Sequence, residues 1–177
     1  MRIIGGAYRG RKIRPPANLM VRPTTDLARE ALFNILNNRY DFEETVILDL
    51  FCGTGAVSYE FISRGSYNVT AVDVSTRCTS FVKATVEQTG MRGLHVITAD
   101  AFYFLEKSTE QWDIIFADPP YMMKESRLLP GLIRKKKLLK PEGCLIIEHP
   151  AEINFSEEEG FAEMRKYGRV HFSFFRF

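Results

Sequence analysis

Four consecutive residues, Asp118-Pro119-Pro120-Tyr121, follow an apolar run and could do chemistry on an amine. The exocyclic amine of a nucleic-acid base is a poor nucleophile, because its lone pair is delocalised into the ring. Acceptors for both of its hydrogens favour a pyramidal nitrogen, and the Asp118 carboxylate and Pro119 carbonyl are two such acceptors. Pro120 has a fixed φ and both prolines lack an N–H, which keeps the turn rigid. The Tyr121 ring can stack on the target base. The plainer alternative is a strand-ending turn.

A glycine-containing segment, residues 49–55, stands where an earlier apolar run meets a predicted helix. This is the crevice position at which open α/β sheets bind ligands. Gly53 and Gly55 allow the backbone to approach a ligand closely. With Ser58 as its third small residue, the segment also resembles a dinucleotide-binding fingerprint. A nicotinamide-dependent oxidoreductase therefore remains an alternative interpretation. The candidate cofactor-binding residues here are Asp49, Phe51, Gly53, Thr54 and Gly55.

Two acidic residues follow the next two apolar runs and share the expected ligand edge. Asp73 comes about twenty residues after the glycines, where a carboxylate can accept both hydrogen bonds of a ribose diol. Asp100 could accept a hydrogen bond from an adenine amino group, or it could simply cap the helix after it. With their neighbours Val74 and Ala101, these residues predict an adenosine-containing cofactor.

The elements that must position these groups follow an α/β pattern. A helical stripe from Leu27 to Leu36 comes first, and short apolar runs then alternate with helical segments, as in a parallel sheet covered on both faces. The last two runs predict an antiparallel hairpin. The expected strands are 46–51, 68–74, 94–99, 112–117 and 144–148, the helices 56–64, 76–89 and 127–139, and the hairpin strands 161–166 and 170–177.

The first 25 residues form a basic, irregular arm ahead of the predicted core, residues 26–177. Such an arm can track a phosphate backbone, although a solvated charged face explains the charges equally well. The candidate RNA contacts are Arg2, Arg9, Arg11, Lys12, Arg14 and Arg22.

Composition narrows the class of protein. A chain of 177 residues, 45% of them hydrophobic, is near the common size of one domain, and its net charge of +2 implies no partner by itself. We find no signal peptide or membrane span, and so expect a cytoplasmic protein. Three widely spaced cysteines predict neither a disulfide nor a metal site. Three residues receive no catalytic role: His95, His149 and His171.

Taken together, these motifs resemble the RsmD family of bacterial methyltransferases, which act on a guanine 2-amino group of small-subunit ribosomal RNA. The likeness covers nearly the whole chain. Its N-terminal blocks, residues 2–11 and 22–34, narrow it to this family, whereas the Asp-Pro-Pro-Tyr motif marks amine methyltransferases more broadly. Two residues depart from the pattern, because Asp73 replaces a longer Glu and Thr54 replaces Ser.

The resemblance implies a class I, Rossmann-like methyltransferase fold of seven strands, the last antiparallel. It also implies S-adenosylmethionine as cofactor and ribosomal RNA in an assembling small subunit as partner. Apart from the resemblance, we expect a monomer without metal. Methylation of an adenine or cytosine amine in DNA, or of a protein glutamine, remains an alternative. A catalytically inactive RNA-binding protein that kept the fold is another.

Overall fold

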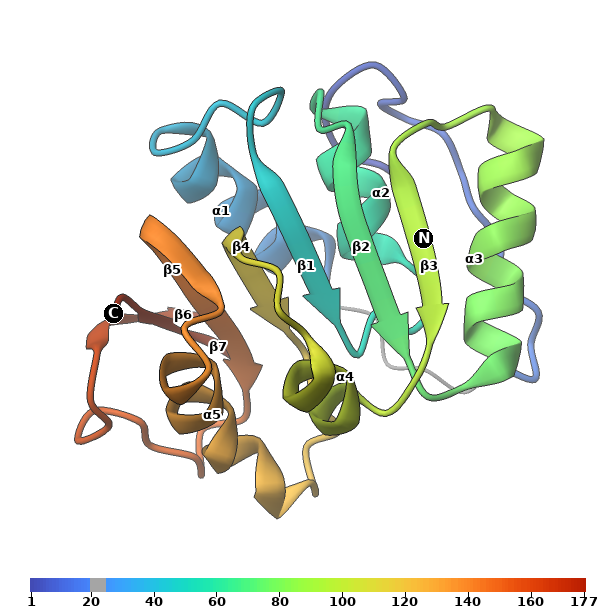
Figure 1. Cartoon of the computed structure of the whole chain (residues 1–177). Helices are drawn as coiled ribbons and strands as arrows, with labels where there is room; N and C mark the ends of the chain where they lie inside the picture. Colours follow the sequence, from blue (N-terminus) through green and yellow to red (C-terminus); the bar gives the residue numbers. More distant parts are fainter. Residues whose placement is uncertain (20–24) are drawn as a thin grey trace.

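The computed structural model describes residues 1–19 and 25–177, which fold around one seven-stranded sheet (Figure 1). The strand order is β3-β2-β1-β4-β5-β7-β6, with β7 antiparallel to both of its neighbours. The predicted α/β architecture and the C-terminal hairpin are thereby confirmed. The strands are β1 Val46–Leu50, β2 Asn68–Asp73, β3 Leu94–Thr98, β4 Trp112–Ala117, β5 Leu139–His149, β6 Phe161–Tyr167 and β7 Val170–Phe175.

Helices cover the two faces of the sheet unequally. On one face α1, α2 and α3 pack through residues such as Phe33, Phe61 and Val82 onto strand residues including Ile114. On the other face the short α4 and α5 cover only part of the sheet (Figure 1). The helices are α1 Asp26–Asn37, α2 Ala56–Ser63, α3 Thr76–Thr89, α4 Ala101–Lys107 and α5 Leu129–Lys135, with a 3₁₀ helix, η1, at Lys124–Leu128.

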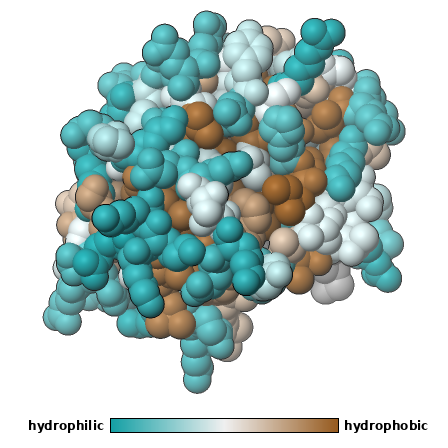
Figure 2. All heavy atoms as spheres, viewed as in Figure 1, coloured by the Kyte–Doolittle hydropathy of each residue, from teal (hydrophilic) through white to brown (hydrophobic). Residues whose placement is uncertain are grey.

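The thinner cover leaves apolar side chains accessible beside β2 and β3. Figure 2 shows hydrophobic atoms among hydrophilic ones over these strands. The side chains of Ile97 and Val74 are 37% and 69% exposed, respectively.

Helix ends follow the capping residues in the sequence. Ser75 accepts a hydrogen bond from the Cys78 N–H at the start of α3, and Gly90 ends the helix at φ +69°. Thr25 caps α1 in the same way, through the Ala28 N–H.

Three details of the sequence prediction are wrong. The helix expected over 127–139 splits into η1 and α5, and α5 ends at Lys135 because the chain turns through Lys137 at φ +53°. Strand β5 consequently begins at Leu139, earlier than the expected residue 144. In α1, Leu32 and Leu36 are buried as expected, but Leu27 is exposed and Arg29 is buried.

The N-terminal segment is irregular, as predicted, but it packs against the core. Ile3 and Ile13 are buried, and an isolated bridge pairs Arg2 with Lys12. The backbone N–H groups of Ile4 and Gly5 donate to the buried Glu60 carboxylate at 2.9 and 2.8 Å. Glu60 lies in α2, so the arm is fixed to the helix that follows the glycine segment. None of the helices in the described part of the chain is long and apolar enough to cross a membrane.

Candidate active site at the carboxyl edge of the sheet

A cavity of about 670 Å³ opens where β1, β2 and β4 end. It brings the glycine segment and the Asp118 motif together, as the sequence predicted. The lining includes the sequence candidates Asp49, Phe51, Gly53, Thr54, Asp73, Val74, Asp100, Ala101, Asp118, Pro119, Pro120 and Tyr121. The ends of β1 and β4 are also joined directly, because the Asp118 N–H donates to the Leu50 carbonyl at 3.3 Å.

The glycine segment reverses the chain through three residues in the left-handed region. Phe51, Gly53 and Gly55 have φ values of +60°, +53° and +83°. A Cβ on Gly55 would lie 2.8 Å from Cζ of Tyr59, so only glycine fits as the N-cap of α2. Gly55 is set back from the cavity lining and serves the turn itself. Gly53 and the bulky Phe51 reach the cavity.

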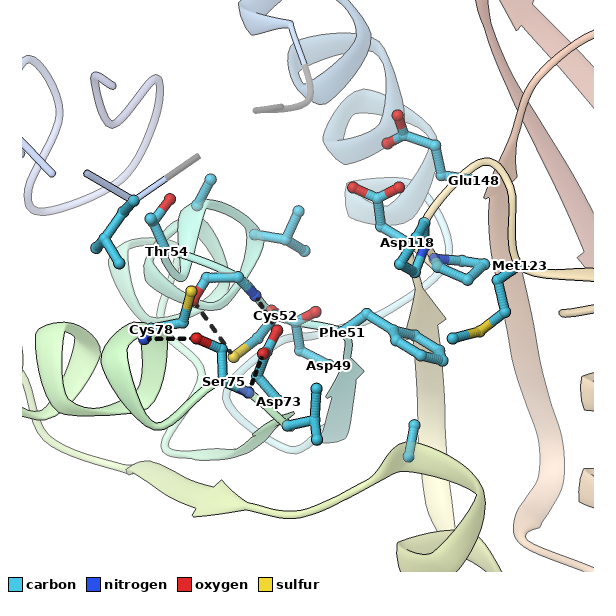
Figure 3. Close-up of a pocket in the computed structure, with 18 of the residues that line it drawn as sticks. Asp49, Phe51, Cys52, Thr54, Asp73, Ser75, Cys78, Asp118, Met123 and Glu148 are labelled. Carbon is cyan, nitrogen blue, oxygen red and sulfur yellow. Dashed lines mark hydrogen bonds between the residues drawn. The ribbon is translucent and has the colours of Figure 1, made fainter. Parts of the chain in front are cut away.

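The Asp73 carboxylate joins the second strand to this turn. One of its oxygens accepts from the Gly53 N–H and the other from the Ser75 N–H, both at 2.8 Å (Figure 3). Each carboxylate oxygen can accept more than one hydrogen bond. The shorter Asp is therefore fixed against the glycine turn and retains acceptor capacity toward the cavity.

Asp49 is the most deeply buried acid of the site. It is 1% exposed and accepts a hydrogen bond from the Ser58 hydroxyl of α2. Burial raises the pKa of Asp49 to about 7, although the Ser58 hydrogen bonds oppose the shift. A cation placed in the cavity would favour the ionised form of this carboxyl group.

Asp100 is a helix cap, which was one of its two sequence interpretations. Its carboxylate accepts from the Tyr103 N–H at 2.9 Å and starts α4. It also lines the cavity, so the cap leaves it on the cofactor edge.

The Asp118 motif leaves β4 in a tight turn. The Met123 N–H donates to the Pro120 carbonyl at 2.8 Å, and Pro119 is buried while Pro120 is exposed. Neither proline has an N–H, so the turn keeps its backbone acceptors oriented without a competing donor. Figure 3 shows the Asp118 side chain directed into the cavity, on the side away from Asp73.

Several lining residues were not picked out from the sequence. Glu148 is the penultimate residue of β5, beside β4, and an acidic residue at the end of an apolar run is the signal that could have identified it. Ser75, Arg77 and Cys78 begin the helix after Asp73, while Asn18 and Leu19 come from the arm. The arm residues bear no motif that points to a cofactor.

The basic candidates of the arm lie outside the cavity lining. All five described candidates, Arg2, Arg9, Arg11, Lys12 and Arg14, are exposed, and Arg2 also lies 3.6 Å from Asp26 in an ion pair. The Arg11 guanidinium stacks over the Tyr8 ring and donates to the Thr89 carbonyl at 3.2 Å. Arg22 falls outside the described residues.

The histidines and cysteines supply no metal centre within residues 1–19 and 25–177, where no group of three potential ligands gathers. His149 and His171 are buried, with stacked rings 5.7 Å apart at the β5–β7 pairing, and His95 lies on exposed β3. The His149 Nε2 atom lies 2.8 Å from the Ser173 hydroxyl. Burial lowers the pKa of His149.

Comparison with known proteins places these features in a family. The ribosomal RNA small subunit methyltransferase D of Buchnera aphidicola (Baizongia pistaciae) is 30% identical over 87% of this chain and 78% of that protein. The putative rRNA methyltransferase YlbH of Bacillus subtilis is 32% identical over 90% of this chain and 88% of its own. The structure of the putative methyltransferase yhhF from Escherichia coli has a TM-score of 0.85 and 27% identity, and the match covers 99% of this chain and 96% of that one.

The family described as Conserved hypothetical protein 95 matches residues 1–176. Since this match and the relatives span nearly the whole sequence, the chain belongs to this family, the RsmD family.

Proposed function

We propose that the chain transfers a methyl group from S-adenosylmethionine to the 2-amino nitrogen of a guanine in small-subunit ribosomal RNA. The observation that carries this is the single cavity shared by the glycine turn, its acidic partners and the Asp118 motif. The Buchnera relative is named a small-subunit rRNA methyltransferase and YlbH a putative rRNA methyltransferase, and these names support RNA as the substrate.

The residues of the cavity fit S-adenosylmethionine. The cofactor carries an ammonium group, a sulfonium and a ribose diol, which are cations and donors, and the cavity offers the carboxylates of Asp49, Asp73 and Asp100. Asp73 would hold the ribose, Asp100 the adenine amine, and Gly53 would allow close approach. Phe51, Thr54, Val74 and Ala101 complete the expected contacts. Burial keeps the Asp49 carboxyl group partly protonated, and a cationic group of the bound cofactor would favour its ionised form.

S-adenosylmethionine supplies an electrophilic methyl group on a sulfonium, which departs as a neutral thioether when the nitrogen lone pair forms the new N–C bond. Asp118 and the Pro119 carbonyl accept the two amine hydrogens and direct that lone pair into the cavity. The methylated nitrogen then loses one proton, which Asp118 is placed to accept. Tyr121 stacks on the guanine, and Pro120 keeps the turn rigid. Orientation of two bound reactants supplies roughly 7–11 kcal/mol of barrier reduction.

The target guanine has to leave its helix, because specific RNA bases are usually read unstacked and unpaired. The exposed arm residues Arg9, Arg11, Lys12 and Arg14 would contact phosphates around it, together with Arg2 and Arg22. We place the reaction in an assembling small ribosomal subunit in the cytoplasm, with the chain acting as one monomeric domain.

To test this, the protein is incubated with trideuteromethyl-labelled S-adenosylmethionine and one substrate at a time. The substrates are ribosomal RNA, small ribosomal subunits, DNA and bulk protein. Digestion and mass spectrometry then identify the labelled product. We expect labelled N2-methylguanosine from the ribosomal substrates alone. Label in N6-methyladenosine, in DNA or in glutamine would overturn the assignment, and NADH binding instead of S-adenosylhomocysteine binding would overturn the reaction class.

A further inference from the structure

Glu148 is a second acid on the substrate side of the cavity. Strands β4 and β5 are parallel neighbours, paired with Ala117 opposite Ile147, so Asp118 and Glu148 occupy the next register position. Neighbouring strands lie about 4.8 Å apart. Glu148 is 3% exposed and lines the cavity beside the Asp118 motif.

The two side chains lie on the same side of the sheet. Phe116 and Ile146, two residues before Asp118 and Glu148, both face the α1–α2 layer, and side chains two apart in a strand share a face. Phe172, opposite Glu148 on β7, also faces this layer. Figure 3 shows both carboxylate groups pointing in the same direction from adjacent strand ends, while Phe51 and Met123 lie to one side of them.

A pair of in-register carboxylates at a buried strand edge is suited to a ligand edge that carries several hydrogen-bond donors. A carboxylate oxygen accepts hydrogen bonds, so two carboxylates at neighbouring strand ends suit a ligand edge that presents donors. The Watson–Crick edge of guanine offers three donor hydrogens in a row, one on N1 and two on N2. Adenine and cytosine instead present a ring-nitrogen acceptor next to their amine.

On this basis we propose that Glu148 is a specificity-determining residue that accepts the guanine N1–H while Asp118 and Pro119 hold the 2-amino group. The inference rests on the proposed function and names how its substrate is chosen. Glu148 selects by repulsion as well as by attraction, since its carboxylate is an acceptor only and would face the ring-nitrogen lone pair of a wrong base.

The analogue 2-aminopurine separates this role from a structural one. It retains the 2-amino group but has an unprotonated N1, an acceptor. The wild-type protein should therefore prefer guanine over 2-aminopurine by about 10- to 100-fold, the range expected for one well-placed base contact. In Glu148→Gln the amide N–H₂ can donate to N1 of 2-aminopurine, so this preference should fall at least about tenfold.

The experiment first uses the product analysis above to locate the methylated nucleotide. Guanine or 2-aminopurine is then placed there by ligation, in whichever RNA or particle accepts the methyl group. Two quantities are measured: the ratio of kcat/KM for the two bases, and binding to the S-adenosylhomocysteine-bound protein, followed by 2-aminopurine fluorescence and by competition with the guanine form. Glu152→Gln, an exposed change just after β5, is the matched control and should keep the wild-type ratios.

The outcomes separate the two proposals. A reduced guanine preference in Glu148→Gln, in turnover and in binding, supports the recognition role. Equal losses on both bases, or an unchanged ratio, would overturn it while leaving N2-guanine methylation intact. If the product analysis finds methylation elsewhere than on a guanine 2-amine, the proposed function fails first, and the specificity inference fails with it.

Discussion

The two sides of the cavity are built differently, although both stand at the same edge of one sheet. On the cofactor side, each carboxylate is fixed by a neighbouring donor: Asp49 by Ser58, Asp73 by Gly53 and Ser75, and Asp100 by Tyr103. On the substrate side, Asp118 and Glu148 stand at the ends of two paired strands, and two prolines follow Asp118 directly.

The difference indicates which property each side controls. Changes on the cofactor side disturb hydrogen bonds that shape the turn, so cofactor affinity and folding should respond together. Changes on the substrate side alter acceptors at the end of a rigid backbone. Turnover and base selectivity should then change while the fold and the cofactor affinity hold.

The largest effect should come from Asp118→Ala. Removing a preorganised acceptor from a reacting centre costs on the order of 10²–10³ in rate. We expect that loss in single-turnover methyl transfer, with S-adenosylhomocysteine affinity by calorimetry within about twofold of wild type. A comparable loss of cofactor affinity would contradict the claim that the two sides of the cavity control different properties. Unchanged turnover would show that Asp118 takes no part in methyl transfer.

Asp49→Asn tests the cofactor side through pH. The folded pKa of Asp49, about 7, lies above its ordinary value of 3.8, so the folded state holds a proton that the unfolded state releases between these values. Stability from this group is complete below pH 4 and is lost as pH rises toward 7, at up to about 1.4 kcal/mol per pH unit. Asn does not ionise, and urea unfolding of the variant should therefore lack this part of the slope. Parallel curves for the two proteins from pH 4 to 8 would refute the assignment.

Sequence patterns predicted where several elements begin and end, but they did not predict the order of the strands in the sheet. Ser75 and Gly90 bracket α3 as expected because caps act through local hydrogen bonds and backbone conformation. Prediction of the helix over 127–139 failed because its residues suit a helix, and tertiary pairing with β4 draws Leu139 into β5. Long-range pairing of this kind leaves no local signal.

The site shows the same limit. The Asp118 motif and the glycine segment carry their chemistry in consecutive residues, so both could be found from sequence. Glu148 acquires its position only when β5 pairs beside β4. Outside the site, Arg29 is buried where α1 lies against Glu60 of α2. Neither pairing is visible in a single sequence.

Asp73 allows a sharper comparison, because it serves both the turn and the expected ribose contact. Asp73→Ala should weaken S-adenosylhomocysteine binding by about tenfold, the value of one or two charge-assisted hydrogen bonds, and lower the melting temperature. Asp73→Glu should recover most of the affinity if reach toward the ribose dominates. If the Glu variant binds as poorly as the Ala variant, the main role of Asp73 is to fix the Gly53 N–H.

The smallest effect per residue belongs to the arm, where charge acts at a distance from the chemistry. Arg9 and Arg14 are exposed, so their replacement by Ala should leave stability and cofactor affinity unchanged. A plot of log K for RNA binding against log salt concentration has a negative slope, and each lost phosphate contact should reduce the magnitude of this slope by about 1. Arg134→Ala, an exposed change in α5 whose partner is Glu159, is the control and should keep the wild-type slope. An unchanged slope in the double arm variant would show that the basic arm is a solvated surface, and RNA binding would then depend on the cavity side of the molecule.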